Sequence, residues 1–276
     1  MMDRIGLTYS VRRKSKVLGI RRQTYYARKQ GYRPEQEDQR IAEQLHAVTK
    51  QFVAWGFWMT FHFLRNKGNV WNHKRVYRVW KSEELHLRKP PKRSKLKRLF
   101  QDLLSPEKVN EGWAMDFVSE WVIGEEQQRV RIINVMDEHS RKALWTEAKR
   151  NIPAEELTNI LDKLVEWRGC PSYIRCDNGP EFISDRLALW AADNKVELRF
   201  IQPGKPTQNG LIERLNGTLR TECLNLEWFE NLEHLNQRIQ EWWHVYNYIR
   251  PHSSIEYKTP DKMEHNSALY FKPVAT

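Results

Sequence analysis

The spacing of apolar and polar residues predicts only helices in the first third of the chain. One or two short basic helices are expected within residues 8–30, and a longer one over residues 35–50. Residues 55–86 predict a helix-turn-helix with its turn at residues 67–69, and a plain helical hairpin is the alternative. The apolar faces of its two helices are Trp58, Phe61, Phe63 and Leu64 in the first and Val76, Val79 and Trp80 in the second. Lys74, Arg75 and Arg78 of the second helix are expected to point outward, as a helix in a DNA groove requires.

After residue 109 the pattern changes to alternating strands and helices. Strands are predicted over residues 113–122, 130–136, 143–146, 172–176 and 196–200, and helices over 153–168, 182–194, 207–224 and 231–248. Three consecutive strands followed by alternating helices and strands indicate an α/β fold with a mixed sheet. The two parts are joined by residues 88–108, where a proline pair and like charges are typical of an extended linker. The expected domains are therefore 1–87, 88–108, 109–265 and a tail, 266–276.

Composition and charge restrict the classes of function that the chain can have. The chain of 276 residues has a net charge of +11, but residues 1–100 carry a balance of +18 and the remainder one of −7. A basic first part predicts a surface that binds nucleic-acid phosphates. The sequence contains no apolar run long enough for a membrane span and no secretory signal pattern. Its three cysteines, Cys170, Cys176 and Cys223, favour a reducing cytoplasm over a disulfide framework.

Three acids stand out because they lie in apolar surroundings, where an unpaired charge is costly. Asp116 lies inside the run 113–118, Asp177 ends the run 173–177, and Glu213 lies in a predicted helix. Carboxylates placed in this way can converge on one or two hard cations such as Mg²⁺ or Mn²⁺. A pair of such ions can stabilise both oxygens of a phosphoryl displacement.

The segments around these acids resemble the DDE motif of retroviral-integrase-type transposases. The matching segments are Asp116, Asp177–Phe182 and Asn209–Asn216, with 35 residues between Asp177 and Glu213. Residues 72–78 and 246–254 also resemble the second-frame product (OrfB) of two-frame bacterial insertion sequences, so the resemblance covers most of the chain. It implies an RNase H-like mixed five-stranded sheet with flanking helices, preceded by the all-α helix-turn-helix region. It also implies metal-dependent cleavage and transfer of DNA strands at the ends of an insertion sequence. The cofactor that it implies is a pair of Mg²⁺ ions, which Mn²⁺ can replace and which Asp116 bridges.

Residues near the motif are candidates for DNA contact, with solvated surface as the alternative. The candidates are Lys205, Asn209, Arg214 and Arg220, and Arg220 is expected on the face of Glu213. Glu181 is interpreted mainly as an acid at a helix N-terminus, and Asp137 and His139 as turn residues. Cys176 is interpreted as a buried core residue. We expect Asn178–Pro180 to form a turn that steers Asp177.

Two other functions stay open: an inactive DNA-binding protein of the same fold, and a metal-dependent nuclease. The three intact acids count against the first, and the helix-turn-helix counts against the second. No cysteine precedes residue 170, so the zinc module of retroviral integrases is excluded at the N-terminus. No leucine heptads precede residue 110, so we expect an upstream-frame partner or fusion half. The other expected partners are double-stranded DNA and further copies of the chain, which would form a homo-oligomer on DNA. The expected location is the bacterial cytoplasm, in association with the nucleoid.

Overall fold

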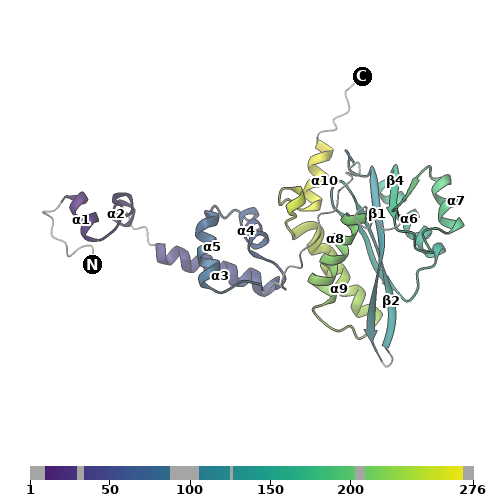
Figure 1. The fold of residues 1–276 in the computed structure, drawn as a ribbon, viewed down its shortest axis with the longest axis horizontal. Helices are drawn as coiled ribbons and strands as arrows, with labels where there is room; N and C mark the ends of the chain where they lie inside the picture. The colour runs from purple at the N-terminus through teal and green to yellow at the C-terminus, as the bar shows by residue number, and fades with distance from the viewer. Residues whose placement is uncertain (1–9, 30–33, 88–105, 125–126, 203–208, 270–276) are drawn as a thin grey trace, which may run out of the picture. The chain divides into compact units, whose positions relative to one another are not determined.

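The structure is a computed structural model that describes residues 10–29, 34–87, 106–124, 127–202 and 209–269 (Figure 1). The chain forms two compact units. One contains Met1–Gln51 and Asn69–His86, and the other contains Phe52–Gly68 and Leu87–Thr276. None of the helices in the described ranges is long and apolar enough to cross a membrane.

The first unit is helical, as predicted. Its helices are α1 (Val11–Val17), α2 (Arg22–Lys29), α3 (Pro34–Gln51) and α5 (His73–Ser82). Helix α5 begins where the side chain of Asn72 accepts a hydrogen bond from the Lys74 amide at 2.9 Å, which satisfies an amide that the helix leaves unpaired. The apolar stripes of α3 and α5 pack together and are buried; they consist of Ile41, Leu45 and Val48 on α3 and Val76, Val79 and Trp80 on α5.

Helix α4 (Phe57–Asn66) belongs to the second unit. It contacts the C-terminal segment, where the His62 ring stacks on Tyr257 with centroids 3.6 Å apart and the Asn66 amide donates to the Tyr257 carbonyl at 3.3 Å. Phe61, Phe63 and Leu64 are buried as predicted, whereas the prediction for Trp58 was wrong, since Trp58 is 51% exposed. Both helices of the expected helix-turn-helix exist, and their pairing and the boundary at 88–108 stay predictions.

The second unit is built on a five-stranded sheet with the order β3-β2-β1-β4-β5. Its strands are β1 (Gly112–Ile123), β2 (Gln127–Asp137), β3 (Ala143–Lys149), β4 (Tyr173–Cys176) and β5 (Glu197–Phe200). The first three are antiparallel neighbours, and β4 and β5 run parallel to β1. Gly112 permits the contact between β1 and β4, because a Cβ there would lie 2.1 Å from the Tyr173 ring. The mixed RNase H-like sheet is thereby confirmed.

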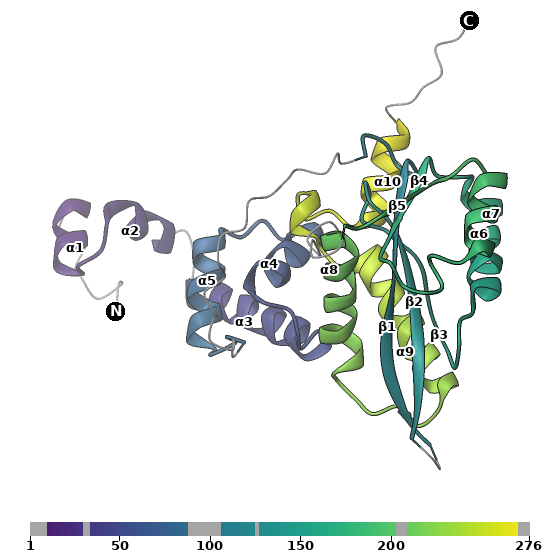
Figure 2. The ribbon, with the colours of Figure 1, turned by 45° about the vertical axis from the view of Figure 1, so that its right-hand side comes forward.

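Helices cover both faces of this sheet (Figure 2). Helices α6 (Ala154–Arg168) and α7 (Asp185–Asp193) cover one face, and α8 (Gly210–Leu219) and α9 (Leu232–His244) cover the other. Side chains alternate along β1, so Trp113 and Met115 pack under α6 and α7 while Ala114 and Val118 pack under α8 and α9. Asp116 lies two residues from both Ala114 and Val118, so its side chain is on the same face of the sheet, the one covered by α8.

Helix ends differ from the predicted ones by a few residues. The helix predicted from residue 182 begins at Asp185, because the Ser184 hydroxyl accepts from the Leu187 amide and starts α7 there. Helices α8 and α9 each continue as one wider π-helical turn, η3 (Arg220–Leu224) and η4 (Val245–Ile249). The chain then forms a short 3₁₀ turn, η5 (Ser253–Ile255), and α10 (Pro260–Leu269).

Candidate active site

Asp116 lies in the middle of the sheet, half-buried on β1. Its Oδ1 accepts a hydrogen bond from the Phe117 amide at 2.8 Å, and its Oδ2 accepts one from Asn216 Nδ2 at 2.7 Å. Burial, followed by the negative charges of Asp177 and Glu213, raises the pKa of Asp116 to about 6, although these two hydrogen bonds act to lower it. The three predicted acids are therefore close enough to affect one another electrostatically.

Asp177 is brought beside Asp116 by the parallel pairing of β1 and β4. Ala114 pairs with Arg175, so each acid follows a paired residue by two positions. Cys176 packs on the α6 and α7 face, which directs the next side chain toward the α8 face. The Asp177 side chain is half-buried, and the turn after it holds its Oδ1, which accepts from the Gly179 amide at 2.8 Å. This is the steering turn that the sequence predicted.

Glu213 is exposed on α8, and a pair of asparagines ties that helix to the sheet. Asn134, fully buried on β2, donates to the Asn216 side-chain oxygen at 2.8 Å, and Asn216 in turn donates to Asp116. Sequence reasoning assigned no such role to Asn216. The available signal was a polar residue in the otherwise apolar stripe of Ile212, Leu215 and Leu219.

The carboxylates are near one another without forming a coordination group. Within the described ranges, no three acidic, histidine or cysteine side chains are already gathered closely enough to hold a metal ion. Asp116 and Asp177 are held by hydrogen bonds, while Glu213 lies on the exposed side of its helix. The donor set consists of carboxylate oxygens, which suit Mg²⁺ or Mn²⁺, and each oxygen keeps a lone pair after one hydrogen bond. A cation would also compensate the charge repulsion that raises the pKa of Asp116.

Glu181 has a different role from the one predicted. It lies three residues before Ser184, the N-cap residue of α7, and forms a bidentate ion pair with Arg131 of β2. The Arg131 guanidinium, which also lies 4.1 Å from the Phe117 ring centroid, lowers the pKa of Glu181. Its interpretation as a helix N-terminal acid was therefore wrong. As a carboxylate engaged by an arginine, it is a matched control for the three acids.

The other uncertain residues have structural contacts. Asp137 is fully buried, and its carboxylate accepts from the amides of Asn110, His139 and Ser140 at 2.6–3.1 Å. The His139 ring contacts the Pro106 carbonyl at 3.0 Å. Cys176 is buried, and burial raises the pKa of its thiol to about 12, so it is a poor nucleophile.

The predicted DNA contacts near the acids fall in different environments. Arg214 is exposed beside Glu213. Arg220 lies against β1, where it donates to the Ser119 carbonyl at 3.0 Å and contacts Glu120 at 3.5 Å, three to four residues along the strand from Asp116. Asn209 is only 3% exposed, and its contact with DNA stays a prediction. Lys205 lies outside the described residues.

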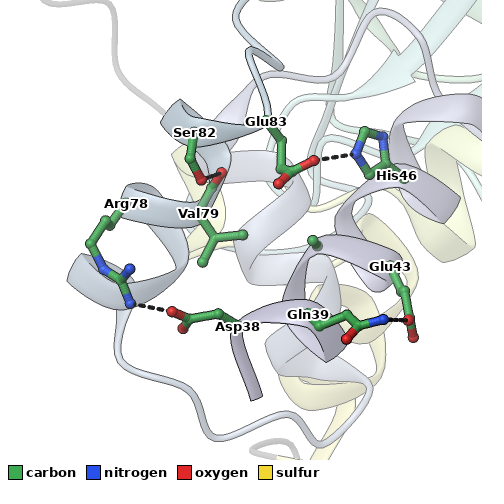
Figure 3. A pocket seen from close by; sticks show the side chains of 9 residues that line it. Asp38, Gln39, Glu43, His46, Arg78, Val79, Ser82 and Glu83 are labelled. Atoms are coloured by element: carbon green, nitrogen blue, oxygen red, sulfur yellow. Dashed lines mark hydrogen bonds and ion pairs between the residues drawn. The ribbon is translucent and has the colours of Figure 1, made fainter. Parts of the chain in front are cut away.

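The three basic residues of α5 that the sequence predicted to contact DNA also differ in their environments: one is exposed, and two are paired with acidic residues. Lys74 is exposed, as predicted. Arg75 does not point outward, because it forms ion pairs with Glu37 at 2.6 Å and Asp38 at 2.8 Å on α3. Arg78 is exposed but also contacts Asp38 at 2.6 Å. The groove between α3 and α5, shown in Figure 3, is lined by the acidic side chains of Asp38, Glu43 and Glu83 as well as by Arg78.

Comparisons with known proteins agree with this fold. Residues 106–206 and 194–260 each match the integrase core domain family. The insertion element IS407 uncharacterized 31.7 kDa protein of Burkholderia multivorans is 33% identical over 253 residues, 92% of this chain and 90% of that protein. Transposase InsD for insertion element IS2A/D/F/H/I/K of Escherichia coli is 21% identical over 81% of this chain and 78% of its own.

Among solved structures, the HTLV-2 integrase catalytic core domain in complex with magnesium is similar, with 19% identity, a TM-score of 0.43, and coverage of 58% of this chain and 99% of that one. That likeness is too weak to bear on chemistry. The sheet and the family match define a protein with an integrase-type catalytic core. The chain belongs to the insertion-element transposases of this type, which are DDE polynucleotidyl transferases.

Proposed function

We propose that this chain cleaves DNA at the ends of a bacterial insertion sequence and joins the cut strand to target DNA. In this proposal Asp116, Asp177 and Glu213 would hold two Mg²⁺ ions, which would supply charge stabilisation for phosphoryl transfer. The observation that carries the proposal is that three elements meet at Asp116: the register of β1 and β4 aligns Asp177 with it, and Asn216, on the helix of Glu213, donates to it. Burial and the like charges of Asp177 and Glu213, which raise the pKa of Asp116, support the same proposal. Such repulsion is costly without a compensating cation.

The chain's own residues would orient the site before a cation arrives. Asn216 and the Phe117 amide fix both oxygens of Asp116, and the Gly179 amide fixes one oxygen of Asp177. Among the three acids, Glu213 has the most conformational freedom, because an exposed glutamate on a helix can change rotamer to reach a cation held by Asp116 and Asp177. The bound ions would activate a water or 3′-hydroxyl nucleophile and stabilise the leaving oxygen.

DNA is the proposed partner, held by the exposed cations near the acids and on α5. Arg214 and Lys74 are exposed, and Arg220 and Arg78 are partly exposed while paired. We propose that the chain acts as a homo-oligomer on DNA with an upstream-frame partner or fusion half. The absence of leucine heptads before residue 110 supports the second point. A purified chain that pairs two element ends unaided would refute it.

The first test is Mn²⁺ binding by the full chain, with and without duplex DNA. Wild type and Glu181→Gln should bind alike, since Glu181 is engaged by Arg131. Asp116→Asn and Asp177→Asn should remain folded and lose binding. Equal binding by all four proteins in the presence of DNA would show that these acids are not the ligands, and would favour the inactive DNA-binding alternative.

A second test separates transposition from simple hydrolysis. Cleavage and strand joining are assayed side by side on duplex DNA carrying element ends. We expect both activities in wild type and neither in Asp116→Asn, Asp177→Asn or Glu213→Gln. Cleavage without joining would instead favour the metal-dependent nuclease.

A further inference from the structure

A second polar cavity lies on the other side of α8 from the acids. It has a volume of about 130 Å³ and is enclosed by the end of β2, the turn that follows it, α8 and the C-terminal segment around η5. The α8 residues that line it are Leu211, Arg214, Leu215 and Thr218, which recur at helical spacing and form one stripe. None of these is a residue that faces Asp116.

The lining is rich in positive charge. It contains Arg141, Arg214 and Arg250 together with Ser253 and Ser254, and none of the described lining residues is acidic. The third lining cation, Arg250, is neutralised by Glu222, to which its Nε donates at 2.9 and 3.0 Å. His252 adds no charge, because burial lowers its pKa to about 3 and its Nε2 donates to the Tyr246 carbonyl at 3.0 Å. The positive charge of the cavity therefore comes from the other two arginines.

Arg141 is the less satisfied of these two. One of its terminal nitrogens donates to the Glu138 carbonyl, but its Nε is buried without a hydrogen-bond partner within the described structure. Its backbone is in the left-handed region, with φ of 66°, a conformation that glycine and asparagine adopt more readily than arginine. Strained residues and unpaired buried donors are both typical of binding sites. The described lining of the cavity therefore offers the Arg141 guanidinium no negatively charged hydrogen-bond acceptor.

The position and size of the cavity indicate which acceptor fits. Arg214 follows Glu213 directly, about 100° around the helix. Met136 of the lining is two residues, about 7 Å, along β2 from Asn134, whose side chain holds Asn216 beside Asp116. A volume of about 130 Å³ has room for several water molecules, and therefore for a phosphate group. Guanidinium groups match phosphate oxygens in geometry as well as charge.

We propose that this cavity binds one backbone phosphate of the DNA, close to the phosphate that the three acids process. Arg141 and Arg214 clamp it from two sides, and the hydroxyls of Ser253 and Ser254 line its mouth. The inference rests on the proposed function for the identity of the ligand. It adds a binding site built by the turn after β2 and the segment after α9, which otherwise have no assigned role.

The test measures duplex DNA affinity in EDTA over a range of salt concentrations, so that no metal contributes. Arg141→Gln and Arg214→Gln should each weaken binding about 3- to 10-fold. Each should also reduce the slope of log K against log salt by up to about 0.9, the value for one phosphate. Because both arginines hold the same phosphate, the double variant should bind little more weakly than the weaker of the two single variants, and its slope should fall by no more than about 0.9 in total.

The matched control is Arg238→Gln on α9, since Arg238 is a partly exposed arginine that is paired with Glu227 and Glu241 and lies outside the lining. Arg214 is exposed, so its variant tests the inference even where Arg141→Gln disturbs folding. Variants that bind DNA like the control, or a double variant whose losses simply multiply, would overturn the shared phosphate site. Inorganic phosphate that stabilises wild type, but not the double variant, while DNA affinity stays unchanged would assign the cavity to a free anion instead.

Failure of this inference is distinguishable from failure of the proposed function. The arginine variants should bind Mn²⁺ like wild type, because no arginine is a metal ligand. Loss of Mn²⁺ binding in Asp116→Asn together with unchanged DNA affinity in the arginine variants would retain the transposase chemistry and reject the phosphate cavity.

Discussion

Asn216 on α8 donates a 2.7 Å hydrogen bond to Asp116 on β1, one hundred residues earlier in the chain. The same side chain accepts from Asn134 of β2 at 2.8 Å. One asparagine therefore sets both the orientation of the central carboxylate and the position of the helix that bears Glu213. The first prediction concerns this residue.

Asn216→Ala should lower Mn²⁺ affinity and strand transfer about 10- to 100-fold, as is usual when a partner that orients a metal ligand is lost. It should also lower the free energy of unfolding by about 1–3 kcal/mol, because the buried Asn134 amide loses its acceptor. Chemical denaturation and Mn²⁺ titration measure the two effects. Gly217→Ala is the control, since a Cβ there meets nothing within 4 Å, and it should stabilise the helix slightly. Unchanged Mn²⁺ affinity in Asn216→Ala would contradict the positioning role.

Asp116→Asn should abolish strand transfer and yet stabilise the fold in EDTA. The pKa of Asp116 is raised from 3.8 to about 6 in the folded protein. The native state therefore favours the protonated form, and the resulting destabilisation is absent below pH 4 and complete above pH 6. We expect a gain of about 1–3 kcal/mol in the free energy of unfolding at pH 7 and little gain at pH 4. Equal stability of wild type and variant at both pH values would show that the carboxylate carries no such cost.

Gly179→Ala should weaken metal binding with little change in stability. A Cβ at this position would lie 3.0 Å from Asp177 Oδ1, so the carboxylate must shift by a few tenths of an ångström. Because catalysis depends on ligand geometry, we expect a loss in strand transfer of about 10-fold or more. Calorimetric melting should remain within a few degrees of wild type. Full activity in this variant would mean that the turn does not steer Asp177.

Lys74→Ala and Arg75→Ala should affect different properties, although the two residues are adjacent. Lys74 is exposed, so its loss should weaken DNA binding and reduce the salt slope by about 0.9. Arg75 is paired with Glu37 and Asp38, so its loss should destabilise the helical unit by about 1–3 kcal/mol. Salt-dependent DNA titrations and denaturation curves give the comparison. Equal losses of DNA affinity would restore Arg75 as an outward DNA contact.

The sequence by itself determined most of the elements and the family to which the chain belongs. Apolar periodicity gave the five strands in order and most of the helices, because burial dictates which side chains face inward. The acids Asp116, Asp177 and Glu213 were evident because each is a charge in apolar surroundings, and their flanking segments resemble one family. The turn at residues 178–180 was predictable because its residue types favour tight turns.

Only the tertiary structure decided which partner each charged side chain has. Arg75 and Glu181 were misjudged because their environments are made by residues 37–38 and by Arg131. Asn216 and the cavity at Arg141 depend on contacts across about 80 to 110 residues. Local pattern reports whether a side chain is buried or exposed. Long-range packing decides which polar group contacts a charged side chain. The identity of that partner determines whether a carboxylate is available to a cation or is engaged in an ion pair.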